Sequence, residues 1–181
     1  MLCRLLNSHP DVTLTFEMRS LLGLEQPPEA YFEHLRRPNP AVPVLRVPGD
    51  GPRQQARRSR RFLRRFHKAI RRGAGDGVVG RELLADVLGR LLPRAQVVGD
   101  KWPGYLDRLV DEHTLDGIPQ LVIHRDCRAV VASTLKRVRG PWGQHAWSKD
   151  IDAADKIAHL WVAATERLGR IRERPEVHVI T

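Results

Sequence analysis

The feature that most constrains the fold is a short apolar segment that ends at an arginine and continues directly into a helical pattern, over Gln120 to Leu135. Leu121, Val122 and Ile123 form a run rich in β-branched residues, which is typical of a parallel strand covered on both faces. Asp126 then suits an N-cap, because its carboxylate can accept hydrogen bonds from the free N–H groups of a first helical turn. This segment therefore predicts a buried strand, a tight turn and a helix.

The helical part of this segment has one apolar side. From Cys127 onwards, apolar residues recur at Val131, Leu135 and Val138, close to the 3.6-residue period of a buried helix. Ser133 falls off this side, so its hydroxyl remains available to a ligand.

The end of the predicted strand is a candidate anion site. Ligands of α/β proteins bind outside the carboxyl ends of parallel strands, and helix N-termini favour anions. Arg125 offers a planar fork that suits a phosphate, and Ser133 follows it eight positions later. The alternative is an arginine that closes a strand and a helix serine that binds nothing. The spacing alone does not decide between the two interpretations.

Strand and helix patterns alternate along the rest of the chain. The strand patterns are Val12–Phe16, Gln96–Lys101, Leu121–Ile123 and Val177–Ile180. Helical patterns cover Glu29–Leu35, Arg53–Arg72, Val79–Leu92, Tyr105–His113 and Ile151–Ile171. This alternation predicts an α/β fold with a small, mostly parallel central sheet flanked by helices on both faces. The length of 181 residues predicts a single domain over residues 1–181.

Three segments carry a family resemblance. They are Met1 to Glu17, which contains Leu5-Leu6-Asn7-Ser8-His9-Pro10, then Gly99 to Leu106, and then Arg125 to Ser133. The first resembles the helix and second strand after the first phosphate loop of sulfotransferases that use 3′-phosphoadenosine 5′-phosphosulfate (PAPS). The second resembles that family's G-[ED]-K-x-P-x-Y segment, and the third resembles its 3′-phosphate-binding motif. The segments stand in the family's order and span most of the chain.

The resemblance implies a P-loop NTPase-like sulfotransferase topology and a direct transfer of the sulfuryl group from PAPS to a hydroxyl or amine. The acceptor would be a small molecule or a glycan. Arg125 and Ser133 would hold the 3′-phosphate, Lys101 would offset charge at the transferring group, and Glu17 would remove the acceptor proton. No metal is required, because cationic side chains and backbone donors can carry the developing charge.

Parts of the family pattern are missing from the sequence. The Gly-rich 5′-phosphosulfate loop, G-x-x-[RK]-[ST]-G-[ST]-[ST], would directly precede Met1, and a C-terminal nucleotide loop would follow Thr181. We therefore expect an incomplete sulfotransferase domain, truncated at both ends, and the sequence leaves open whether this chain is active without the missing loop.

The two residues with proposed chemical roles also have simpler interpretations. Glu17 follows a predicted strand at its carboxyl end, where a carboxylate can take a proton from an attacking hydroxyl. It could instead cap a helix over Met18–Leu22 or pair with Arg19. Lys101 could contact the transferring group, or it could be an exposed lysine that pairs with Asp100.

The charge of the chain predicts anionic partners. The formal net charge is +10, and the segment Arg53–Arg72 contains many arginines and no acid. Phe62, Phe66 and Ile70 give this segment an apolar side, so it reads as a surface helix with a solvated basic face. The alternative is a landing site for an acidic acceptor or nucleic acid. No nucleic-acid-binding module is recognisable, so nucleic acid is not the expected partner. The second function hypothesis is nevertheless a non-catalytic basic protein that binds nucleotides or nucleic acid.

Two further expectations concern the surroundings of the site and of the protein. The proline-rich loop over residues 36–52 is expected to lie over the acceptor site, and Trp142 or Trp147 could wall it, although ordinary packing is the simpler interpretation. Cys3 and Cys127 do not suggest a disulfide framework, and no apolar run reaches the roughly 20 residues of a membrane span. We therefore predict a cytoplasmic protein without a membrane span.

Overall fold

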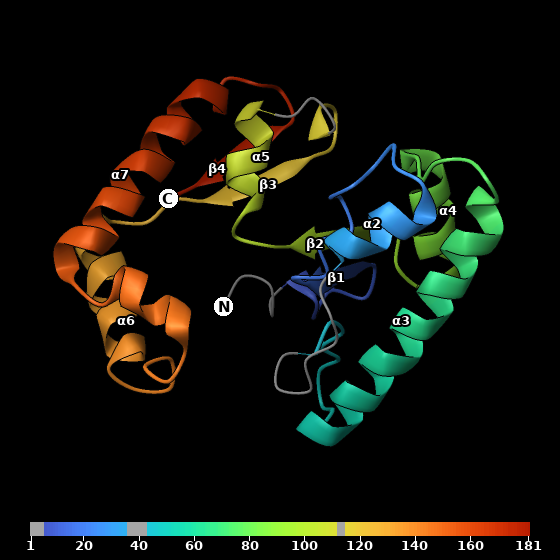
Figure 1. The fold of residues 1–181 in the computed structure, drawn as a ribbon, viewed down its shortest axis with the longest axis horizontal. Helices are drawn as coiled ribbons and strands as arrows, with labels where there is room; N and C mark the ends of the chain where they lie inside the picture. The colour runs from blue at the N-terminus through green and yellow to red at the C-terminus, as the bar shows by residue number, and fades with distance from the viewer. Residues whose placement is uncertain (1–5, 36–42, 112–114) are drawn as a thin grey trace. The chain divides into compact units, whose positions relative to one another are not determined.

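The computed structural model describes residues 6–35, 43–111 and 115–181, and it has a mixed α/β architecture of helices and short parallel strand pairs (Figure 1). The chain divides into two compact units, Met1–Pro103 and Gly104–Thr181. The single domain predicted over residues 1–181 stays a prediction. Predictions for residues 1–5, 36–42 and 112–114, including Cys3, lie outside the described residues.

The first unit contains one pair of parallel strands, β1 (Val12–Phe16) and β2 (Val97–Lys101). Both strands lie where the sequence predicted them. In the register of the pair, Phe16 lies opposite Lys101. Gly99 allows the strands to approach, because a Cβ at this position would lie 2.8 Å from Cδ2 of Leu14.

Three helices build the core of the first unit: α2 (Pro28–His34), α3 (Pro52–Ala74) and α4 (Arg81–Leu91). Both α2 and α3 have proline in the first turn, where the missing N–H costs no hydrogen bond. The apolar side predicted for α3 is confirmed, since Phe62, Phe66 and Ile70 are buried in the core. The arginine side chains of α3 are exposed on the opposite side, as expected for an amphipathic helix.

The second unit contains the pair β3 (Gln120–Ile123) and β4 (Val177–Ile180), which is also parallel. Its helices are α5 (Tyr105–Asp111), α6 (Cys127–Val138) and α7 (Ala154–Ile171). A 3₁₀ helix over Ala146–Ile151 precedes α7, so the long helix predicted from Ile151 begins three residues late. The described strands thus form two separate parallel pairs, where the sequence predicted one central sheet.

Three details of the sequence-based expectation are wrong. The strand β3 is not buried on both faces, because Leu121 is 46% exposed and Ile123 is 50% exposed. These two residues share one face of a two-stranded sheet, whereas a parallel strand in a larger sheet is covered on both sides. Within α6, only Val138 of the predicted apolar side is buried, while Val131 and Leu135 are half-buried. The helix considered for residues 18–22 is also absent, since residues 18 and 19 are irregular and residues 20–22 form a turn.

No helix among the described residues is both long enough and apolar enough to cross a membrane.

Candidate functional site

The carboxyl ends of β1 and β2 bring the two predicted chemical residues together. The N–H of Glu17 donates to the carbonyl of Lys101 at 2.7 Å, which extends the pairing one residue beyond β1. The side chains then meet as an ion pair, with 3.4 Å between Nζ of Lys101 and Oε1 of Glu17. The side chains are 32% exposed for Glu17 and 39% for Lys101, so both remain accessible to a ligand.

The loop after β1 is organised by the carboxylate of Asp100. Its Oδ1 accepts hydrogen bonds from the hydroxyl of Thr15 at 2.8 Å and from the N–H of Met18 at 3.2 Å. Its Oδ2 accepts from the N–H groups of Arg19 at 2.7 Å and Ser20 at 3.2 Å. Successive backbone N–H groups that converge in this way form a concave anion site, and here the protein fills it with its own carboxylate.

This arrangement explains why the residues after β1 do not form a helix. Glu17 and Arg19 have φ angles of +52° and +64°, in the left-handed region that costs energy for residues other than glycine. The hydrogen bonds to Asp100 offset this cost, because they satisfy N–H groups that would otherwise lose their partners. A contact more than 80 residues away in the sequence therefore fixes the backbone of Glu17.

The same loop is attached to the hydrophobic core. The hydroxyl of Tyr31, which is fully buried, donates to the carbonyl of Ser20 at 2.7 Å. Burial, and then the negative charge of Asp100, raises the pKa of Tyr31 far above its usual range, so the phenol stays a neutral donor. The guanidinium of Arg19 lies 4.9 Å from the centre of the Trp102 ring. The loop that carries Glu17 is thus fixed by the hydrogen bond from Tyr31 and by the contact between Arg19 and Trp102.

The pair Glu17–Lys101 has two complementary chemical capacities. A carboxylate at a strand end can accept a proton from a hydroxyl or amine that attacks an electrophile. An ammonium group beside it can offset negative charge that develops on a transferring group or on a leaving group. Among the residues that the structure describes, no three His, Cys, Asp or Glu side chains gather in a way that would hold a metal ion.

The second unit contains the other two predicted site residues. Asp126 caps α6 as predicted, since its Oδ1 accepts from the N–H of Ala129 at 3.1 Å. This hydrogen bond is the main reason that the pKa of Asp126 is lowered. Arg125 is exposed, and its carbonyl accepts from Nε1 of Trp161 at 2.8 Å. Within the described part of the chain, its guanidinium has neither an ion-pair nor a hydrogen-bond partner.

Ser133 has a weaker claim to a ligand than Arg125. Its hydroxyl donates to the carbonyl of Val130 at 3.0 Å, one turn earlier in α6. Seven residues after Asp126, it lies on the same side of the helix and roughly 10 Å further along the axis. To hold a phosphate, the hydroxyl of Ser133 would have to donate its hydrogen bond to the phosphate instead of to the carbonyl of Val130.

Other side chains near this strand end pack against one another. Nε2 of His124 lies 3.2 Å from Oγ1 of Thr165, and its ring centre is 5.2 Å from that of Trp161. The rings of Trp142 and Trp147 are 5.4 Å apart at an edge-on angle, and Trp147 is half exposed. The two tryptophans thus pack against each other, which was the simpler interpretation of them. That one of them also forms a wall of the acceptor site stays a prediction.

The structure therefore brings Glu17 and Lys101 together in the first unit, whereas Arg125 and Ser133 both belong to the second unit but make no contact with each other in the described part of the chain. Sequence reasoning missed the role of Asp100, although the G-[ED]-K pattern already contained an acid beside the lysine. It also missed Arg46, whose guanidinium lies 4.3 Å from the centre of the Phe16 ring beside Glu17 and for which no motif gave a signal. No protein-family model, curated protein or solved structure matches this chain significantly.

Proposed function

We propose that this chain is a sulfotransferase that moves the sulfuryl group of PAPS to a hydroxyl or amine acceptor. The observation that carries the proposal is the ion pair of Glu17 and Lys101 at the adjoining carboxyl ends of two parallel strands. Parallel α/β sheets bind their substrates at this edge. The order of the three sulfotransferase-like segments supports the same conclusion, and the P-loop NTPase-like topology belongs to this proposal.

The nucleotide would be recognised through its 3′-phosphate. Arg125 stands immediately before the N-terminus of α6, and its exposed guanidinium has no partner among the described residues. A guanidinium can hold a phosphate through two parallel hydrogen bonds, and the helix N-terminus favours the same negative charge. Ser133 would add a hydrogen bond after it releases the carbonyl of Val130.

The chemical step is a direct displacement at sulfur. The acceptor oxygen or nitrogen attacks the sulfur atom while the bond from sulfur to the 5′-phosphate oxygen breaks. The bonding electrons leave with 3′-phosphoadenosine 5′-phosphate, and the acceptor proton passes to the carboxylate of Glu17. Lys101 offsets the negative charge that grows on the oxygen atoms around sulfur.

A second candidate is a basic protein that binds nucleotides or nucleic acid without catalysis. The exposed arginines of α3 favour it, because such a surface attracts any polyanion. The two candidates differ in nucleotide selectivity. A sulfotransferase site would prefer an adenosine nucleotide that has a 3′-phosphate, whereas a surface that binds any polyanion would show no such preference.

Calorimetric titration with 3′-phosphoadenosine 5′-phosphate tests the proposal. We expect saturable binding that Arg125→Ala weakens by about 10- to 100-fold, the scale of a lost charge-assisted contact. Arg139→Ala is the matched control, because it removes the same charge beyond the other end of α6 and should change the affinity little. A folded wild-type chain that does not bind the nucleotide, or two variants that weaken binding equally, would contradict the proposal.

A further inference from the structure

A hollow of about 520 Å³ lies beside the carboxyl end of β1 in the first unit. Phe16, the residue before Glu17, forms part of its wall. Residues 43–51, which we call the linker segment, form much of the rest and contribute Arg46. No acidic side chain of the described residues lines this hollow, so its charged lining is a single guanidinium.

Arg46 is poised for an anion. Its guanidinium lies 4.3 Å from the centre of the Phe16 ring, which holds it in place without neutralising its charge. Its Nε is buried and has no hydrogen-bond partner in the described part of the chain. A buried donor without a partner costs free energy, and an oxygen atom of a ligand would satisfy it.

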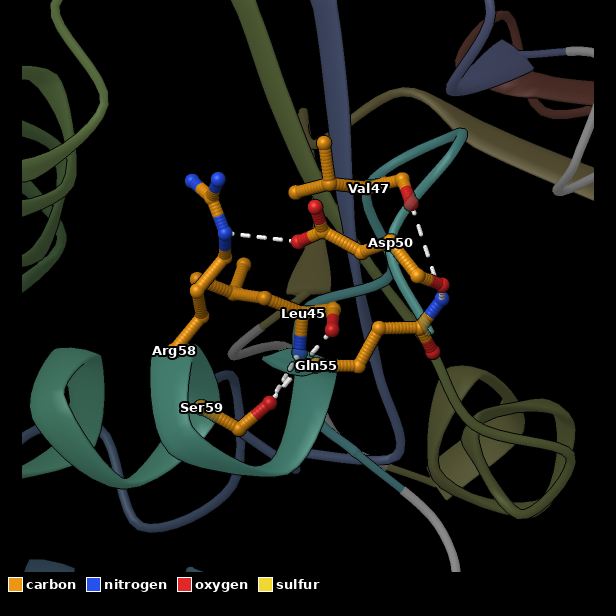
Figure 2. Close-up of polar contacts among 6 residues, drawn as sticks. All are labelled: Leu45, Val47, Asp50, Gln55, Arg58 and Ser59. Atoms are coloured by element: carbon orange, nitrogen blue, oxygen red, sulfur yellow. Dashed lines mark hydrogen bonds and ion pairs between the residues drawn. The ribbon is translucent and has the colours of Figure 1, made fainter. Parts of the chain in front are cut away.

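The linker segment is fixed to its neighbours (Figure 2). The N–H of Leu45 donates to Oγ of Ser59 at 3.0 Å, and Asp50 pairs with Nε of Arg58 at 2.6 Å. On the other side, the N–H of Phe16 donates to the carbonyl of Val44 at 2.8 Å. Arg46 therefore stands on a segment whose position relative to β1 and α3 is set by hydrogen bonds.

A second hollow, of about 850 Å³, runs along α3. Four arginines line it: Arg53, Arg57, Arg60 and Arg64. Their spacings of four, three and four residues place them in one row on the helix, which we call the arginine stripe. None of the four has an ion-pair or hydrogen-bond partner in the described ranges. Pro52 lines both hollows, so the stripe continues from the hollow that contains Arg46.

The shape of this surface limits what can bind it. The stripe covers 12 residues of helix, and its first and last residues are 11 steps apart, which is roughly 16 Å at the rise of an α-helix. A single small anion would not use such a row, whereas a chain with repeated anionic groups would. The apolar side of α3 is buried in the core, so the helix cannot insert into a membrane surface. Of the described residues that line this hollow, only His67 has an aromatic ring, and that ring already stacks on Phe32, so the surface has no row of rings on which the bases of a single-stranded nucleic acid could stack.

We infer that the acceptor of the proposed transfer is an acidic polysaccharide, which lies along the arginine stripe and places an anionic group at Arg46. Carboxylate and sulfate groups match the planar guanidinium fork. The same polymer supplies a hydroxyl at nearly every sugar, as attack near Glu17 requires. The catalytic part of this inference rests on the proposed function, and the binding surface stands on its own observations.

Two triple variants of the full chain test the surface. R57Q/R60Q/R64Q removes three charges from the stripe, whereas R61Q/R65Q/R72Q removes three charges from the same helix outside it. The probe is a heparin oligosaccharide of defined length, and calorimetry measures its dissociation constant in each variant. We expect the first variant to weaken binding by about tenfold or more, and the second by less than about threefold.

Arg46→Gln completes the test, with circular dichroism as the check that every variant folds. This substitution should also weaken the binding of the heparin oligosaccharide, by about tenfold. Equal losses in the two triple variants would overturn the inference, because binding would then follow the total charge alone. Duplex DNA that binds as tightly as heparin, with the same dependence on the stripe, would also overturn it and would assign the surface to nucleic acid.

Titration of the same variants with 3′-phosphoadenosine 5′-phosphate separates this inference from the proposed function. Nucleotide binding should be unchanged in all of them, since Arg125 and Ser133, which are proposed to hold the 3′-phosphate, are not among the substituted residues. Nucleotide binding without heparin binding would overturn the polysaccharide inference alone. Stripe-dependent heparin binding without nucleotide binding would overturn the proposed function, and with it the role of the polysaccharide as an acceptor.

Discussion

Substitution of Asp100 by asparagine should destabilise the loop that carries Glu17. The carboxylate of Asp100 accepts from the Thr15 hydroxyl and from the N–H groups of Met18, Arg19 and Ser20. Asparagine keeps one acceptor oxygen and presents an NH₂ group in place of the other, so two of the four donors lose their partner. At about 1.5 kcal/mol for each hydrogen bond to a charged group, the expected loss of stability is about 3 kcal/mol.

Urea unfolding followed by far-ultraviolet circular dichroism measures this loss. Asp86→Asn is the matched control, because Asp86 pairs with Arg90 on the exposed surface of α4 and should contribute less than about 0.5 kcal/mol. Asp100→Ala removes all four hydrogen bonds and should destabilise the chain more than Asp100→Asn does. If Asp100→Asn unfolds within about 0.5 kcal/mol of the wild type, the loop does not depend on this carboxylate and the reasoning is refuted.

Three further predictions concern other parts of the chain. Phe66 is fully buried, so Phe66→Ala should lower the free energy of unfolding by about 3–5 kcal/mol in a urea titration. Burial, and then the charge of Arg71, lowers the pKa of His67, so the unfolded chain binds the proton more readily. The melting temperature should therefore fall as the pH drops through about 6.5. In His67→Phe, which lacks the imidazole, the melting temperature should fall less over the same pH range. Glu17→Gln should slow sulfuryl transfer from PAPS by about 10²- to 10⁴-fold with unchanged nucleotide affinity, as measured by turnover and calorimetry.

Local patterns in the sequence predicted the elements that depend on local contacts. The apolar side of Arg53–Arg72 predicted α3, because the apolar residues that recur at the helical period are the ones that the structure buries in the core. The alternation in Val12–Phe16 predicted β1, and Asp126 was identified as the cap of α6. Each of these signals lies within a few residues of the element that it describes.

The features that the sequence did not predict depend on distant contacts. The turns after Glu17 follow from hydrogen bonds to Asp100, and no local pattern reports a partner that far along the chain. The apolar run at Leu121 and Ile123 predicted burial, yet burial depends on how many strands and helices surround a strand. Arg46 becomes a candidate binding residue only through its contact with the ring of Phe16 and its place in the hollow beside β1, and the local sequence shows neither.

The most direct test of the proposed function compares two nucleotides that differ only in the 3′-phosphate. Calorimetry measures the affinities of 3′-phosphoadenosine 5′-phosphate and adenosine 5′-phosphate for the wild type and for Arg125→Ala. We predict that the wild type prefers the first nucleotide by about tenfold or more, and that Arg125→Ala removes most of this preference. A wild type without the preference, or a preference that survives in Arg125→Ala, would contradict the assignment of the 3′-phosphate to Arg125.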